Sequence, residues 1–140
     1  MIRVLIVDDD VSLRQLLAFM LEREPEFQLV AEVGTLAEAR RVLQDADIAI
    51  VDMMLPDGSG ADLVGELRAA NPGCRVLVLT SVVNRVLLAR AMQAGAAGIV
   101  QKSARIGEIV DALRQLDRGE QLLSPAEASE LQRLVDEPQE

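Results

Sequence analysis

Five short apolar runs, each followed by a segment of helical period, constrain the fold of this chain more than any other feature. The runs are rich in branched aliphatic residues and lie at 2–7, 27–33, 47–52, 74–80 and 98–102. Three of them are almost continuously apolar, as strands are when helices cover both faces of a parallel sheet. The alternation therefore predicts an α/β fold built on a five-stranded parallel sheet.

Helical periodicity between the runs predicts five helices. In the first, Leu13, Leu16, Leu17, Met20 and Leu21 form one apolar stripe. The others are expected at 35–44, 59–70, 84–94 and 105–118. Residues 1–119 then make one domain, and 120–140 an acidic linker or C-terminal helix that Ser124 can cap, with Pro125 at its first position.

Composition and charge exclude several classes of function. The chain has no His, which excludes His-dependent triads and His general bases. Its one cysteine, Cys74, cannot form an internal disulfide, and no charged-then-apolar leader precedes the first strand, so we expect a reducing, cytoplasmic location. The net charge is −9, no basic stripe suits nucleic acid, and no apolar run reaches the roughly 18 residues of a membrane span.

Acidic residues gather where ligands of parallel sheets bind, which is beyond the carboxyl ends of the strands. Asp8, Asp9 and Asp10 follow the first run, and Asp52 ends the third. If these two strands are neighbours, about 4.8 Å apart, their carboxylates converge on one small volume. Carboxylates so close repel one another, and Mg²⁺, a hard cation that prefers oxygen ligands, removes that conflict.

A hydroxyl and an amine are expected at the same edge of the sheet. Thr80 ends the fourth run and Lys102 the fifth. A carboxylate beside Mg²⁺ can attack a phosphoryl group, while the amine neutralises one phosphoryl oxygen and the hydroxyl donates to another. Each residue alone has an ordinary structural role, but acids, hydroxyl and amine together favour phosphoryl transfer.

Four motifs carry a family resemblance: IVDDD, VDMMLPDGSG, VLVLTS and GAAGIVQKS. With them, residues 1 to about 119 resemble a response-regulator receiver domain of a two-component system. The resemblance implies a doubly wound (βα)5 flavodoxin/CheY-like fold with strand order 2-1-3-4-5. It also implies that Asp52 accepts a phosphoryl group from a sensor histidine kinase. Asp8, Asp9, Asp52 and the backbone carbonyl of Met54 are then the Mg²⁺ ligands.

The resemblance implies roles for the remaining residues of the edge. Thr80 becomes the switch hydroxyl and Lys102 the amine that pairs with the phosphoryl group. Asp10 lies one residue past the acidic pair, and we expect it to cap a helix instead.

Finer features are similar to the NarL/FixJ (LuxR-type) subfamily. Ser103, not Pro, follows Lys102, and QLLSP after the last helix resembles that group's linker. Such proteins usually continue into a helix-turn-helix DNA-binding domain, for which this chain has no basic recognition helix. The chain is therefore either an excised receiver or a single-domain regulator. In the first case the resemblance implies transcription regulation through an output domain absent from this chain. It also suggests a phosphorylation-dependent homodimer formed by the first and last helices.

Three features depart from the usual receiver pattern. Ile99 occupies the position three before Lys102 that usually holds Tyr or Phe, so an aromatic rotamer switch cannot operate. Met54 and Val82 flank the path of water to an aspartyl phosphate, and neither can orient water by hydrogen bonding, which predicts slow spontaneous dephosphorylation. The segment 81–95 is more apolar than one buried stripe requires, which fits either a partner surface or wide core packing.

Two other classes of function remain alternatives to a signalling module that is not a turnover enzyme. One is a phosphate-independent scaffold with a relic site, which the Ile99 position favours. The other is a small phosphatase of the haloacid-dehalogenase kind, for which Asp8 and Asp10 offer the DxD spacing. That class needs a further acidic pair near a late strand end, whereas Asp111 and Asp117 fall inside a predicted helix.

Overall fold

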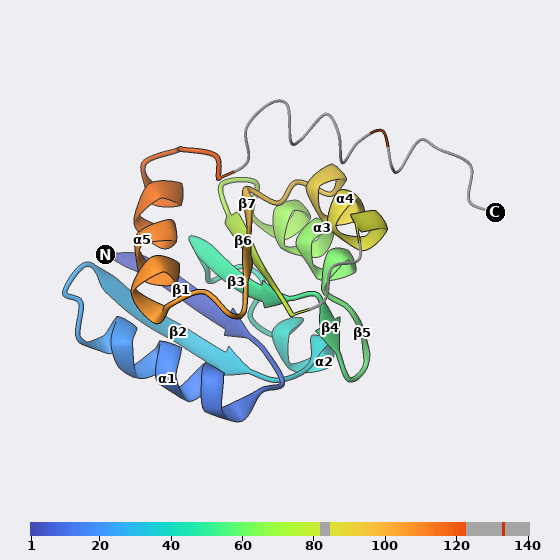
Figure 1. The fold of residues 1–140 in the computed structure, drawn as a ribbon. Coiled ribbons are helices and arrows are strands. Elements are labelled where there is room, and N and C mark those ends of the chain that lie inside the picture. Colours follow the sequence, from blue (N-terminus) through green and yellow to red (C-terminus); the bar gives the residue numbers. More distant parts are fainter. Residues whose placement is uncertain (82–84, 123–132, 134–140) are drawn as a thin grey trace.

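The predicted parallel sheet is present in the computed structural model, which describes residues 1–81, 85–122 and 133 (Figure 1). Its strand order is β2-β1-β3-β6-β7, with every neighbouring pair parallel. The strands are β1 (Ile2–Val7), β2 (Phe27–Val33), β3 (Ile48–Asp52), β6 (Arg75–Thr80) and β7 (Gly98–Gln101). The order corresponds to the expected 2-1-3-4-5, and each strand end lies within one residue of its predicted position.

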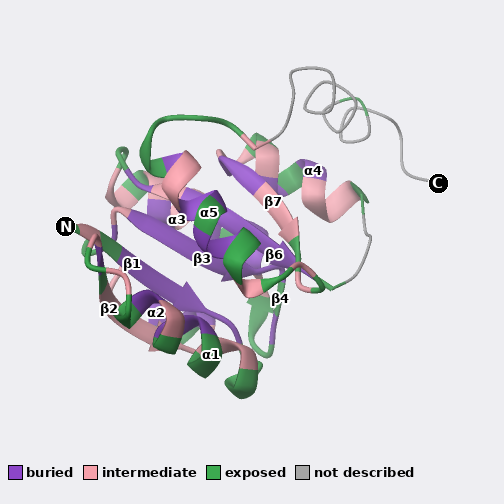
Figure 2. Cartoon of the chain, turned by 60° about the vertical axis from the view of Figure 1, so that its left-hand side comes forward, coloured by how far each residue is buried: buried purple, intermediate pink, exposed green. Residues whose placement is uncertain are grey.

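Two helical layers cover the sheet, one on each face. The helices are α1 (Val11–Glu22), α2 (Leu36–Ala39), α3 (Gly60–Ala70), α4 (Arg85–Gln93) and α5 (Ile106–Asp117). Alternate residues of the strands point to opposite faces, so Val4 and Ile6 pack with α1 and α5, whereas Leu5 and Val7 pack with α2, α3 and α4. The central strands are buried on both sides (Figure 2), which explains their continuous apolar runs.

The second helix is much shorter than predicted. The expected span of 35–44 is wrong, because α2 ends at Ala39 and turns follow it. The amides of Arg41 and Val42 donate to carbonyls three residues back instead of four, which tightens the chain out of the α-helix. Val42 and Leu43 still pack against the core from these turns, so tertiary packing outweighs local helix propensity here.

An antiparallel hairpin that periodicity did not predict follows β3. Its strands are β4 (Met54–Leu55) and β5 (Gly58–Ser59), and Met54 pairs with Ser59. The turn is Pro56-Asp57, and Gly58 has a φ of +153°, a conformation that favours glycine. The hairpin lies between β3 and α3, directly beside the carboxyl edge of the sheet.

The first helix buries a narrower face than its apolar stripe suggests. Leu17, Ala18 and Leu21 are buried, and Leu13 and Met20 pack at the margin of the same core. Leu16 is 46% exposed, because the buried face is centred one residue away from it. The expected single stripe is therefore correct only in part.

The chain returns to the edge of the sheet after α5. The amide of Leu122 donates to the carbonyl of Ala97 over 3.2 Å. Gly98 makes room for Leu122, since a Cβ on Gly98 would lie 2.7 Å from the Leu122 Cβ. The linker helix expected at Ser124 and Pro125 lies outside the described residues.

The apolar residues of the fourth helix that the structure describes favour core packing over a partner surface. Leu87, Leu88 and Met92 pack against the core on the α2, α3 and α4 face, while Val82 and Val83 lie outside the described residues. Within the described part of the chain, no helix is both long and apolar enough to span a membrane.

Candidate functional site

The acidic residues converge at the carboxyl edge of two neighbouring strands. Asp8 follows β1 and Asp52 ends β3, and these strands pair in register up to Val7 and Val51. Carboxylate oxygens of Asp8, Asp9 and Asp52 all lie within 4.8 Å of one another. The expected convergence of carboxylates is therefore present, and the roles of the individual residues stay predictions.

Lys102, the only lysine of the chain, joins two of these carboxylates. Its Nζ donates to Oδ1 of Asp8 and to Oδ2 of Asp52, each over 2.9 Å. Burial alone would lower the pKa of the ammonium, but the hydrogen bonds to Asp52 and Asp8 outweigh it and raise that pKa. One fixed positive charge thus lies between two buried negative charges.

The carboxylate of Asp52 is buried and held at both oxygens. Oδ1 accepts from the backbone N–H of Met54 over 3.2 Å, and Oδ2 accepts from Lys102. Burial raises the pKa of Asp52, with the charge of Asp8 adding to it, while the bonds from Lys102 and Met54 oppose that rise. The charged form of Asp52 is therefore under-compensated, and a further cation nearby would favour it.

Asp8 has one oxygen with two donors and one with none. Oδ1 accepts from the amide of Asp10 over 2.9 Å and from Lys102, whereas Oδ2 is buried without a hydrogen-bond partner. It is the one buried side-chain nitrogen or oxygen without a partner among the described residues. An unpartnered buried carboxylate oxygen is costly, and a hard cation held by oxygen ligands would satisfy it. The donor set therefore fits Mg²⁺.

The third aspartate of the first cluster has a structural role. Asp10 is the N-cap of α1, and its Oδ1 accepts from the amide of Leu13 over 3.1 Å. Asp9, in contrast, is exposed and contributes an oxygen to the acidic group. The cap expected at Asp10 is confirmed.

Thr80 ends β6, and Lys102, which directly follows β7, lies beside it. Thr80 is buried at the end of β6, and its carbonyl accepts from the backbone amide of Lys102 over 2.8 Å. Asp52 pairs with Leu79 in the adjacent strand, so Thr80 lies one position beyond it. Ile99 is half-buried against the core, and Val82 lies outside the described residues.

Two residues that sequence reasoning missed support the acidic edge. Arg14 donates from Nη1 to the carbonyl of Asp8 over 2.8 Å, and its Nε lies 3.3 Å from a carboxylate oxygen of Glu32. Gly60 begins α3 so close to β3 that a Cβ there would lie 2.0 Å from the carbonyl oxygen of Asp52. No sequence signal marked Arg14, but the Gly60 of the DGSG motif marks a place where backbones approach closely.

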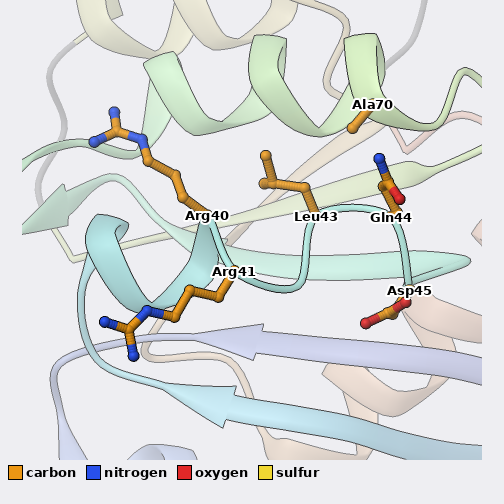
Figure 3. Close-up of a pocket in the computed structure, with 6 residues that line it drawn as sticks. All are labelled: Arg40, Arg41, Leu43, Gln44, Asp45 and Ala70. Atoms are coloured by element: carbon orange, nitrogen blue, oxygen red, sulfur yellow. The ribbon is translucent and has the colours of Figure 1, made fainter.

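Two of the hollows that the described residues form lie outside the acidic cluster. A small apolar one of about 200 Å³ beside the hairpin is lined by Met53, Met54, Leu55, Gly58, Ser59 and Leu87. A larger one of about 300 Å³ lies between the turns after α2 and the end of α3 (Figure 3), lined by Arg40, Arg41, Leu43, Gln44, Asp45 and Ala70. The larger hollow contains none of the predicted site residues.

Comparisons with known proteins agree on one family. The response regulator receiver domain family matches residues 4–114. The DNA-binding transcriptional activator DevR/DosR of Mycobacterium tuberculosis is 35% identical over 133 residues, which cover 94% of this chain and 61% of that protein. The chain therefore spans less than two thirds of that curated relative.

Solved structures with the same fold include two that are 30% and 25% identical to this chain. A LuxR family two-component response regulator from Aurantimonas sp. SI85-9A1 matches with a TM-score of 0.79 and 30% identity, covering 97% of this chain and 99% of that one. The isolated REC domain of RcsB from Salmonella enterica serovar Typhimurium, in the presence of phosphomimetic BeF3−, matches with a TM-score of 0.77 and 25% identity, covering 93% and 97%.

Proposed function

This chain belongs to the response regulator receiver domain family, and from that premise we propose that it is a phosphoacceptor module controlled by a sensor histidine kinase. The observation that carries the proposal is the Lys102 ammonium between Asp8 and Asp52, beside an Asp8 oxygen with no partner. This arrangement supplies a buried nucleophile, a fixed cation and an oxygen site for a second cation. These are the components that phosphoryl transfer to a carboxylate requires.

In the proposed reaction an oxygen of Asp52 attacks the phosphorus of a phosphohistidine. The new O–P bond makes an acyl phosphate, and the P–N bond breaks with its electron pair passing to the donor imidazole. Asp8, Asp9, Asp52 and the carbonyl of Met54 would hold Mg²⁺, which supplies positive charge to the anionic phosphoryl oxygens.

Lys102 and Thr80 then respond to the new group. Lys102 exchanges its bond to Asp52 for one to a phosphoryl oxygen, and the Thr80 hydroxyl donates to another. Since Ile99 replaces the usual aromatic residue, we propose that the change reaches the surface through Thr80 and the residues that follow it.

We further propose that residues 1–119 act as the receiver and residues 120–140 as an acidic connection to a DNA-binding output domain. The relative DevR/DosR is named a DNA-binding transcriptional activator, and it is longer than this chain. In this proposal the chain is cytoplasmic, is not a turnover enzyme, and contacts neither DNA nor membrane itself.

The proposed homodimer uses α1 and α5. Val11, Leu16 and Phe19 on α1 are 50%, 46% and 54% exposed, so this helix offers apolar surface to a partner. Burying them against a second copy would remove apolar surface from water. We expect phosphorylation to favour that association.

The test is intact mass after incubation with Mg²⁺ and acetyl phosphate. We expect the wild-type chain to gain one phosphoryl group, which requires Mg²⁺ and is lost in Asp52→Ala. Asp62→Ala, which removes an exposed acid on α3, is the matched control and should behave as wild type. Uptake that survives in Asp52→Ala, or failure of wild type with both acetyl phosphate and a cognate kinase, would overturn the proposal in favour of a relic scaffold.

A further inference from the structure

The β4–β5 hairpin is bonded at its tip to the start of α2. Asp57, in the hairpin turn, accepts from the amide of Leu36 over 2.8 Å with Oδ1 and from the amide of Ala37 over 3.1 Å with Oδ2. These donors lie about twenty residues earlier in the chain. Asp57 therefore links two segments that no strand pairing connects.

A steric contact reinforces this bond. Leu36 is buried, and its Cδ1 occupies the space beside Gly58, where a Cβ would lie 2.5 Å away. The glycine thus lets the hairpin tip approach α2 closely. The position of the tip is fixed by a polar and an apolar contact together.

The helix that holds the tip is itself anchored. Arg40, at the end of α2, makes a bidentate ion pair with Glu66 of α3. Its Nε donates to Oε1 over 2.8 Å and its Nη2 to Oε2 over 3.1 Å. At its base the hairpin is fixed by the Met54 amide on Asp52 and by the amide of Gly60 on the carbonyl of Met53. Met54 lies in the hairpin that these contacts hold, and its carbonyl is the proposed metal ligand.

We propose that Asp57 is a positioning residue for the metal site, because its bonds to α2 fix the hairpin that presents the Met54 carbonyl to Mg²⁺. The inference rests on the proposed function, in which that carbonyl is a metal ligand. Residues that hold metal ligands in place without touching the metal still affect its affinity. Losing one typically weakens metal binding about 10- to 100-fold.

A capping role alone would make a different prediction. Thr35 is the N-cap of α2, and its Oγ1 accepts from the amide of Glu38 over 3.1 Å. If Asp57 served only to stabilise α2, truncating Thr35 or Asp57 would lower the melting temperature and have the same effect on Mg²⁺ binding. If Asp57 positions the hairpin, only the loss of Asp57 weakens Mg²⁺ binding.

The experiment compares Asp57→Ala with Thr35→Ala in the 140-residue chain. Isothermal titration calorimetry with Mg²⁺ gives the dissociation constant, and thermal unfolding followed by circular dichroism gives the melting temperature. We expect both variants to melt at a lower temperature than wild type. We expect Asp57→Ala to bind Mg²⁺ about tenfold more weakly, the lower end of such losses, and Thr35→Ala to bind it as wild type does.

Equal Mg²⁺ dissociation constants in Asp57→Ala and wild type would overturn the inference, as would an equal weakening in both variants. If Asp57→Ala does not fold, Asp57→Asn decides, since it keeps one acceptor oxygen and should bind Mg²⁺ with intermediate strength. Failure of the wild-type chain to bind Mg²⁺ would instead refute the proposed metal site, and the role of Asp57 with it. The two failures are thus distinguished by the wild-type titration alone.

Discussion

One ammonium group at Lys102 serves two buried carboxylates, while a third carboxylate lies within reach of both. The charges at this edge are therefore unequal in number, with three acids and one base. Because Asp8 and Asp52 are buried, solvent screens the charges of these two carboxylates little, whereas the charge of Asp9 is exposed to it. The residue-scale arrangement explains both the orphaned oxygen of Asp8 and the raised pKa of Asp52.

The first prediction concerns removal of that ammonium. Lys102→Met keeps the aliphatic stem but leaves Asp8 and Asp52 without a positive partner, so the free energy of unfolding in chelator should fall by about 3 kcal/mol. Mg²⁺ should then restore more stability to the variant than it adds to wild type. Urea unfolding followed by circular dichroism, with and without Mg²⁺, measures both effects. An equal Mg²⁺ effect in the two proteins would contradict the prediction.

The second prediction concerns the lifetime of the aspartyl phosphate. The side chain of Met54 is 59% exposed and offers water no hydrogen bond. The double variant Met54→Asn with Val82→Glu should shorten the lifetime at least about tenfold, because polar groups can orient the attacking water. Loss of the phosphoryl group, followed by intact mass over time, is the readout. An unchanged lifetime would show that the lack of a polar group to orient water at these positions is not what makes dephosphorylation slow.

At the scale of elements, alternation of apolar runs predicted every strand of the parallel sheet, but it could not predict where α2 ends or that a hairpin follows β3. Residues 40–45 have helix-compatible composition, and only their contacts with the core and with α3 turn them away from the helix. The hairpin had a signal that periodicity does not read, since Asp57-Gly58 is a dipeptide typical of tight hairpins. The acidic edge was predictable because strand ends alone place Asp8 and Asp52. The bonds of Arg14 and Asp57 required knowledge of which distant segments meet.

The third prediction compares two glycines of α3. A Cβ on Gly60 would lie 2.0 Å from the backbone oxygen of Asp52, whereas one on Gly65 would meet nothing within 4 Å. Gly60→Ala should therefore destabilise the protein by about 1–3 kcal/mol or more and weaken Mg²⁺ binding. Gly65→Ala should stabilise it by about 0.5–1 kcal/mol. Chemical unfolding of both variants checks the signs, and a stable Gly60→Ala would refute the close approach.

At the scale of the whole molecule, two aliphatic cores on opposite faces of one sheet provide the stability. The chain has two Phe, no Tyr and no Trp, so packing of branched side chains replaces aromatic contacts. Ion pairs at the surface link α5 to the turn before β2. Arg114 of α5 bonds Glu26 in the turn before β2 over 2.7 Å and Asp111 over 3.0 Å.

The fourth prediction is the pH dependence of this stability. The hydrogen bond from Arg114 lowers the pKa of Glu26 below its usual 4.5, and the amides of Leu36 and Ala37 lower that of Asp57 below 3.8. Groups with lowered pKa values stabilise the fold above the ordinary pKa, and this contribution is lost as the pH falls through the folded-state value. Stability in chelator should therefore fall between about pH 5 and pH 3, although Asp52, whose pKa burial raises, works in the opposite direction.

Urea unfolding over that pH range measures the effect. Glu26→Gln should make the acid fall shallower and lower the stability at neutral pH. Glu22→Gln, on the exposed side of α1, serves as the control and should leave the curve as in wild type. An identical curve for Glu26→Gln would mean that its bond to Arg114 contributes nothing to acid sensitivity.

The contact of Leu122 with Gly98 has a mechanical consequence. The amide of Leu122 is bonded to Ala97, directly before β7, and Lys102 directly follows β7. Five residues of extended chain separate these points, about 16 Å, with one rigid backbone between them. A displacement of β7 along its axis at one end is transmitted to the other without passing through a helix or the interior of the sheet. The edge strand β7 is thus a short, direct connection between Lys102 at the acidic site and the point where Leu122, beyond α5, contacts the sheet.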